Sequence, residues 1–114
     1  MCHVLIIEDE PLIAMTIQDL LEEEGATSFD IAVTEADAVN AAMIRRPDLI
    51  TSDVKLIEGT GPAAVETIHR RVGDVPVIFI SGTPEDCQPC DPPGIILRKP
   101  LRQGALADAF HRMM

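Results

Sequence analysis

Short apolar runs separated by helical segments constrain the fold of this 114-residue chain more than any other feature. Four runs are almost purely apolar, and a fifth, at residues 28–33, is weaker and alternates with polar residues. The four are residues 3–7, 48–52, 75–80 and 94–97. Continuous runs of this length, rich in Ile and Val, are typical of strands that are buried on both faces of a parallel sheet. We therefore expect five strands.

Residues with helical periodicity fill the intervals between these runs. In the first interval, Ile13, Ile17 and Leu21 recur at a spacing that places them on one helical face, after a proline that suits a first turn. We expect helices over residues 11–24, 34–46 and 61–72, and from about Leu101 onwards. Strands that alternate with helices predict a doubly wound α/β domain.

One interval, residues 81–94, departs from this alternation. Its four prolines leave room for one helical turn at most, since an interior proline costs about 3 kcal/mol. We expect the helix between the fourth and fifth strands to be short or absent. The interval also contains Cys87 and Cys90, but a structural zinc site needs four ligands, and the chain has no second pair with this spacing. A redox dithiol normally lies where a helix begins, which the prolines disfavour.

The composition excludes several classes of function. The net charge is −10 and no run of Lys or Arg occurs, which argues against a nucleic-acid surface, because such a surface needs basic residues to neutralise phosphates. No apolar run approaches the roughly 20 residues of a membrane-spanning helix, and the amino terminus lacks the basic region of a signal peptide. Three cysteines do not make a disulfide framework. We expect one cytoplasmic domain over residues 1–114, with no output domain and with neither nucleic acid nor membrane as a partner.

Polar side chains follow the runs at the points where the strands end. Glu8 and Asp9 follow the run at residues 3–7, Asp53 follows the run at 48–52, and Ser81 follows the run at 75–80. Lys99 follows the run at 94–97, after Arg98. The carboxyl ends of parallel strands lie along one edge of a sheet, which is where open α/β folds bind ligands. The sheet therefore brings three carboxylates, one hydroxyl and one ammonium group into one small site.

The charges of this group predict its chemistry. Three neighbouring carboxylates repel one another unless a cation joins them, and a hard divalent ion such as Mg²⁺ prefers oxygen ligands. Mg²⁺ and Lys99 would neutralise phosphoryl oxygens and leave Asp53 placed to attack phosphorus, giving an acyl phosphate. Ser81 would donate a hydrogen bond to the remaining phosphoryl oxygen. We therefore expect Asp53, Lys99 and Ser81 to be the catalytic residues.

This set of residues, with Gly61 eight positions after Asp53 and Pro100 directly after Lys99, resembles the response-regulator receiver domain of two-component systems. The resemblance covers essentially the whole chain. It implies a flavodoxin-like α/β fold, in which five parallel strands are arranged in the order 2-1-3-4-5.

The resemblance also implies a role for each polar residue of the site. The magnesium ligands are Asp9 directly, Glu8 largely through water, Asp53, and the backbone carbonyl of Lys55. Ser81 moves toward the phosphoryl group and acts as the switch. The domain would thus be a phosphoprotein that catalyses its own phosphorylation and, more slowly, its own dephosphorylation.

The implied partners are proteins of a phosphorelay. The phosphoryl group would come from a phosphohistidine on a sensor histidine kinase or a histidine phosphotransferase, which docks near residues 11–15. The signal would pass by a conformational change to a downstream protein. The family usually has an aromatic residue three positions before the lysine, and here that residue is Ile96. We therefore expect the signal to be read on another surface, or through residues 82–94.

Two other functions stay open. A pseudo-receiver would keep the acidic site but bind its partner without phosphate. Ile96 and the short interval after Ser81 favour it, and the intact Asp53, Ser81 and Lys99 oppose it. A metal-dependent phosphatase of similar topology would need a second acid two positions after its nucleophile, where this chain has Lys55. The side chain of Lys55 is either simply solvated or approaches the acceptor and alters the lifetime of the phosphoryl group.

Overall fold

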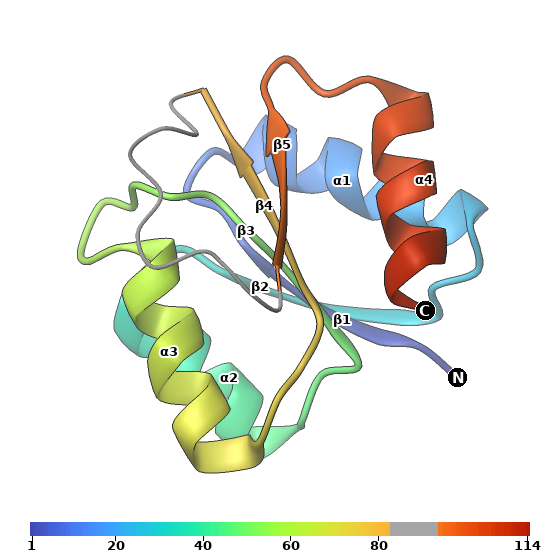
Figure 1. Ribbon diagram of the computed structural model, residues 1–114. Helices are drawn as coiled ribbons and strands as arrows, with labels where there is room; N and C mark the ends of the chain where they lie inside the picture. Colours follow the sequence, from blue (N-terminus) through green and yellow to red (C-terminus); the bar gives the residue numbers. More distant parts are fainter. Residues whose placement is uncertain (83–93) are drawn as a thin grey trace.

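The computed structural model describes residues 1–82 and 94–114, and it contains a five-stranded sheet. The strands are β1 (His3–Ile7), β2 (Ser28–Ala32), β3 (Leu49–Ser52), β4 (Val77–Ser81) and β5 (Gly94–Arg98). All neighbouring strands are parallel, and their order across the sheet is β2-β1-β3-β4-β5. The predicted doubly wound sheet and its strand order are confirmed (Figure 1).

Four helices in the described residues cover the two faces of this sheet. They are α1 (Pro11–Glu23), α2 (Glu35–Ile44), α3 (Gly61–Val72) and α4 (Gln103–Met113). Helices α1 and α4 lie on one face, and α2 and α3 lie on the other (Figure 1). None of these helices is long and apolar enough to cross a membrane. The helix that we expect to be short or absent between β4 and β5, together with Cys87 and Cys90, lies outside the described residues.

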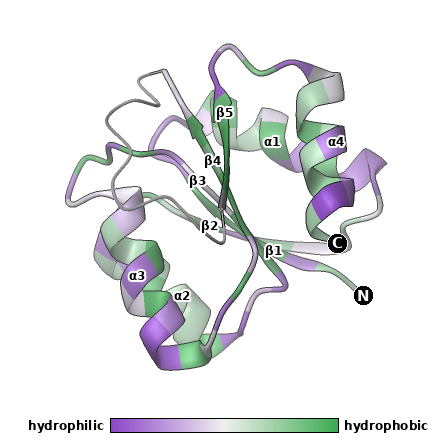
Figure 2. Cartoon of the chain, viewed as in Figure 1, coloured by the Kyte–Doolittle hydropathy of each residue, from purple (hydrophilic) through white to green (hydrophobic). Residues whose placement is uncertain are grey.

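The two helical layers explain why the central strands are apolar on both sides. Along β1, Leu5 and Ile7 pack into a core with α2 and α3, whereas Val4 and Ile6 pack into a second core with α1 and α4. Figure 2 shows hydrophobic residues along the central strands and hydrophilic patches on α3 and α4. Burial on both faces removes the alternation of a half-exposed strand, so the sequence reads as continuous apolar runs.

Side-chain caps begin two of the helices and so fix the loops that lead into them. Thr34 Oγ1 accepts a hydrogen bond of 3.1 Å from the backbone N–H of Asp37 at the start of α2. Thr60 Oγ1 accepts a hydrogen bond of 3.2 Å from the backbone N–H of Ala63 at the start of α3. Thr60 therefore marks the end of the loop that begins at Asp53.

One buried hydroxyl in β3 makes no hydrogen bond among the described residues. Thr51 is fully buried, and its Oγ1 has no partner there. A buried polar group without a partner costs about 1–3 kcal/mol, so we expect Thr51→Val, which keeps the shape of the side chain, to raise the free energy of unfolding by about 1 kcal/mol. Urea denaturation measures this change. Thr51→Ser keeps the hydroxyl and should give no gain; a less stable Thr51→Val protein would contradict the explanation.

Candidate functional site

The ends of four strands, β1, β3, β4 and β5, bring the predicted polar residues to one edge of the sheet. Ile7 pairs with Ser52, and Ser81 pairs with Arg98, so the residues that follow these strands leave the sheet side by side. Backbone hydrogen bonds continue this alignment beyond the strands. Asp53 N–H donates to Ile7 O at 2.9 Å, and Lys99 N–H donates to Ser81 O at 2.9 Å.

Lys99 joins two of the predicted acids directly. Its Nζ donates hydrogen bonds to Asp53 Oδ2 at 3.0 Å and to Glu8 Oε1 at 3.2 Å, across 46 and 91 residues of sequence. Glu8 is only 1% exposed, Asp53 is 13% exposed and Lys99 is 19% exposed. Charged hydrogen bonds between groups that are this well buried are much stronger than ion pairs on an open surface.

The surroundings shift the protonation of two of these groups. Burial and the negative charge of Asp53 raise the pKa of Glu8 from 4.5 to about 7, although Lys99 and the backbone N–H of Glu10 oppose the shift. Burial lowers the pKa of Lys99, but its hydrogen bond to Asp53 and the charges of Glu8 and Asp53 outweigh this effect, so the pKa of Lys99 lies above its usual value. The site therefore holds more negative charge than Lys99 alone can balance.

Three consecutive acids form a candidate cation site beside this pair. The carboxylate oxygens of Glu8, Asp9 and Glu10 lie within 4.8 Å of one another, and Glu10 N–H donates to Glu8 Oε2 at 3.2 Å. Oxygen ligands of this kind suit Mg²⁺, so the residues fit the predicted ion. Asp53 does not belong to this group of three in the described residues, since its Oδ2 is bonded to the Lys99 ammonium.

The backbone around Asp53 is held from several sides. Asp53 Oδ1 accepts a hydrogen bond of 2.7 Å from Val54 N–H, and Ser52 Oγ donates to Asp53 O at 2.8 Å. Gly61 N–H donates to Val54 O at 2.9 Å, and a Cβ atom at Gly61 would overlap the carbonyl oxygen of Asp53. The first residue of α3 therefore packs directly on the backbone of Asp53.

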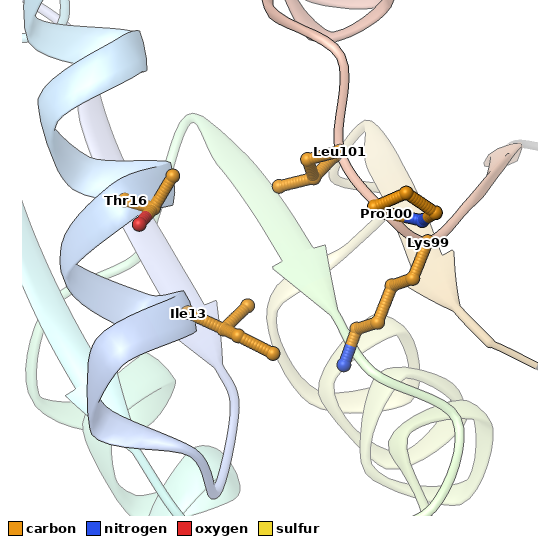
Figure 3. Close-up of a pocket in the computed structure, with 5 residues that line it drawn as sticks. All are labelled: Ile13, Thr16, Lys99, Pro100 and Leu101. Atoms are coloured by element: carbon orange, nitrogen blue, oxygen red, sulfur yellow. The ribbon is translucent and has the colours of Figure 1, made fainter.

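A cavity of about 490 Å³ lies next to Lys99. Its lining comes from the first turns of α1 (Ile13 and Thr16) and from the segment after β5 (Lys99, Pro100 and Leu101). Figure 3 shows these two walls facing each other, with the Lys99 ammonium extending away from Pro100. An apolar hollow thus opens beside a charged group that reaches Asp53.

A model of the response regulator receiver domain matches residues 4–110 of this chain, which is nearly its full length. The chain belongs to the response regulator receiver domain family.

Relatives of this receiver domain include regulators that are longer than the chain itself. The phyllosphere-induced regulator PhyR of Methylorubrum extorquens is 40% identical over 84 residues, which are 73% of this chain and 32% of PhyR. The chain therefore spans about a third of the length of that relative.

Solved structures of PhyR proteins share the fold of this receiver domain. The receiver domain of Erythrobacter litoralis PhyR is 34% identical with a TM-score of 0.88, and the match covers 98% of this chain and 88% of that one. A mutant of the anti-anti-sigma factor PhyR from Bartonella quintana is 32% identical with a TM-score of 0.78, covering 97% of this chain and 49% of that one.

The structure brings the predicted residues of this receiver domain together to different degrees. Glu8, Asp53 and Lys99 are in direct contact, and Asp9 lies beside Glu8. Ser81 is buried at the end of β4 and is linked to Lys99 through the backbone. Lys55 is exposed and pairs with Thr60 in an isolated antiparallel bridge. Sequence reasoning took Glu10 only as the residue before the first helix, although three acids in a row were a signal that it belongs to the acidic group.

Proposed function

We propose that this receiver domain is a phosphoacceptor. Asp53 takes a phosphoryl group from a phosphohistidine of a sensor histidine kinase or a histidine phosphotransferase, and the phosphorylated domain signals to a protein partner by a conformational change. The observation that carries the proposal is the Lys99 ammonium, which lies 3.0 Å from Asp53 Oδ2 and 3.2 Å from the buried Glu8. A carboxylate paired with a lysine beside further acids has the parts that phosphoryl transfer needs.

The transfer balances without any other reactant. A carboxylate oxygen of Asp53 attacks phosphorus and forms an O–P bond, while the N–P bond breaks and its electron pair returns to the donor imidazole, which leaves as a neutral ring because its other nitrogen carries a proton. Lys99 exchanges its contact with Asp53 for one with a phosphoryl oxygen, and Ser81 donates to another. Glu8, Asp9, Asp53 and the carbonyl of Lys55 would hold Mg²⁺, which supplies positive charge to the phosphoryl oxygens.

The face around α1 suits the docking of such a donor. Leu12 and Met15 are 79% and 58% exposed, so this helix presents apolar side chains to solvent. The cavity lined by Ile13, Thr16 and Leu101 lies against the same helix, next to Lys99. An apolar side chain of the donor placed in this cavity would bring its phosphohistidine close to Asp53.

Asp53→Asn tests the proposal. Incubation of the parent protein with Mg²⁺ and acetyl phosphate should add one phosphoryl group, seen by mass spectrometry of the intact protein. The adduct should disappear in Asp53→Asn, because the amide is not a nucleophile, and in the parent after Mg²⁺ is chelated. An adduct of equal yield in Asp53→Asn would place the phosphoryl group elsewhere and overturn the proposal.

A pseudo-receiver is the second candidate, favoured by one observation. Ile96 of β5 is aliphatic and 38% exposed, in the position where the family usually has an aromatic residue that swings inward on phosphorylation. The domain would then bind its protein partner without phosphate. If no adduct forms with acetyl phosphate or with any kinase, and Asp53→Asn still binds the partner normally, the pseudo-receiver is the better description.

A further inference from the structure

The loop that follows Asp53 is fastened to the first turn of α2. The loop is closed by the bridge between Lys55 and Thr60, and Leu56 N–H donates to Gly59 O at 3.4 Å. Glu35, the first residue of α2, contacts the loop at two points. Its backbone N–H donates to Glu58 O at 3.1 Å, and its Oε1 accepts a hydrogen bond of 3.2 Å from Thr60 N–H.

A glycine makes room for the second of these contacts. Gly59 has a φ of +82°, a conformation that side chains other than glycine rarely adopt. A Cβ atom at Gly59 would also overlap the side chain of Glu35. The carboxylate of Glu35 therefore lies against the backbone of the loop because residue 59 has no side chain.

The residue that Glu35 holds is connected to the proposed phosphorylation site on both sides. Thr60 pairs with Lys55, whose backbone carbonyl is a proposed ligand of Mg²⁺. Thr60 also caps α3, and the next residue, Gly61, packs on the carbonyl oxygen of Asp53. A shift of Thr60 would therefore move both the metal ligand and the support of the phosphoacceptor.

We propose that Glu35 is a positioning residue of the phosphorylation site, which sets the affinity for Mg²⁺ by holding Thr60 and, through it, the carbonyl of Lys55. This inference rests on the proposed function and deepens it. Glu35 acts through a hydrogen bond and not through its charge, because its Oε1 contacts the Thr60 N–H and lies outside the acidic group of Glu8, Asp9 and Glu10. Its action requires an acceptor oxygen at the end of the side chain.

Two neighbouring variants separate this role from ordinary helix stabilisation. Glu35→Gln keeps an acceptor oxygen and removes the charge. Asp37→Ala removes a charge from the same first turn of α2. Within the described residues, the side chain of Asp37 makes no hydrogen bond or ion pair with the loop. Any loss that comes only from the helix dipole should appear in Glu35→Gln and Asp37→Ala as well as in Glu35→Ala.

The decisive measurement is the dependence of two quantities on Mg²⁺ concentration. Direct titration with Mg²⁺, followed by amide chemical shifts, should give a dissociation constant about fivefold higher for Glu35→Ala than for the parent. The rate of Asp53 phosphorylation by acetyl phosphate should fall at low Mg²⁺ and recover to within about twofold at saturating Mg²⁺. Glu35→Gln and Asp37→Ala should stay close to the parent in both.

A double-mutant cycle with Gly59→Ala tests the contact itself. Gly59→Ala should weaken Mg²⁺ binding in the parent, and its effect should be smaller in a Glu35→Ala background, because the overlap with the Glu35 carboxylate is removed and only the overlap with Cβ, which alanine keeps, is left. Equal effects in the two backgrounds would overturn the contact as the cause.

Hydrogen exchange without Mg²⁺ distinguishes this inference from the proposed function. The Thr60 amide should exchange several-fold faster in Glu35→Ala than in Glu35→Gln or Asp37→Ala. Unchanged exchange together with unchanged Mg²⁺ affinity would overturn the role of Glu35 while leaving phosphorylation of Asp53 intact. A parent protein that binds no Mg²⁺ and forms no adduct would overturn the proposed function, and the metal part of this inference with it.

Discussion

Replacing Gly61 with alanine is expected to lower the free energy of unfolding by about 3 kcal/mol, at the upper end of the cost of overpacking a core. The added Cβ would overlap the carbonyl oxygen of Asp53 and the hydroxyl of Ser52. A backbone carbonyl cannot rotate away as a flexible side chain can, so the loop or the start of α3 must move. Urea denaturation, followed by circular dichroism, measures the loss.

Gly104 offers a matched control for this substitution. It lies in α4, and a Cβ atom there would meet nothing within 4 Å. Gly104→Ala should therefore stabilise the protein by about 0.5–1 kcal/mol, since alanine favours the helix. If Gly61→Ala and Gly104→Ala change the free energy of unfolding by similar amounts, then the close packing of α3 against Asp53 is not the reason that position 61 requires glycine.

Gly61→Ala should also slow phosphorylation more than its loss of stability requires. Measured under conditions where the variant is still folded, the rate of adduct formation should fall because the backbone that carries Asp53 has moved. A folded variant that is phosphorylated at the parent rate would show that the backbone shift is taken up entirely within α3.

Much of the fold could be predicted because the pattern of the chain is local. Buried parallel strands produce continuous apolar runs, and residues with helical spacing mark the segments between them. The residues at which strands begin and end follow less directly from the apolar runs. The run at 75–80 predicts a strand over those residues, but β4 is Val77–Ser81. Val75 is apolar because it is buried, although it does not belong to the strand, and the strand ends on the polar residue Ser81.

The site could be predicted only as far as sheet topology determines it. Parallel strands bring Glu8, Asp53 and Lys99 to one edge, so their proximity follows from their positions at strand ends. The role inferred for Glu35 could not be predicted, because it depends on a hydrogen bond between the first turn of α2 and a loop residue 25 positions further along the chain. Contacts of this kind are set by side-chain reach in three dimensions and leave no periodic signal in the sequence.

Glu8→Gln is expected to stabilise the magnesium-free protein above pH 7 by about 1–3 kcal/mol. Folding raises the pKa of Glu8 from 4.5 to about 7, because the side chain is buried and faces Asp53. Between these two pH values the folded protein keeps a proton that the unfolded chain has released. The free energy of unfolding therefore falls as pH rises from 4.5 to 7, and it levels off above 7.

The full shift corresponds to about 3 kcal/mol, since one pKa unit is worth 1.36 kcal/mol. Glutamine removes this cost but provides one acceptor oxygen where Glu8 uses two, for Lys99 and for the N–H of Glu10. The gain should therefore be smaller than the full shift. Urea denaturation at several pH values should give a flatter profile between pH 4.5 and 7 for Glu8→Gln than for the parent. A parent profile without a decline in this range would contradict the explanation.

Glu10→Gln is the control that tests burial as the cause. Glu10 belongs to the same acidic group but is exposed, so its replacement should change the free energy of unfolding without Mg²⁺ by less than about 0.5 kcal/mol.

The addition of Mg²⁺ should reduce the stability advantage of Glu8→Gln over the parent protein. An ion that binds only the folded protein adds about 2.7 kcal/mol at 100 times its dissociation constant, and the parent, with one more carboxylate, should gain more than the variant. The difference in the free energy of unfolding between Glu8→Gln and the parent should therefore become smaller as Mg²⁺ is added. If Mg²⁺ stabilises both equally, the charge of Glu8 does not serve the ion, and its burial beside Asp53 needs another reason.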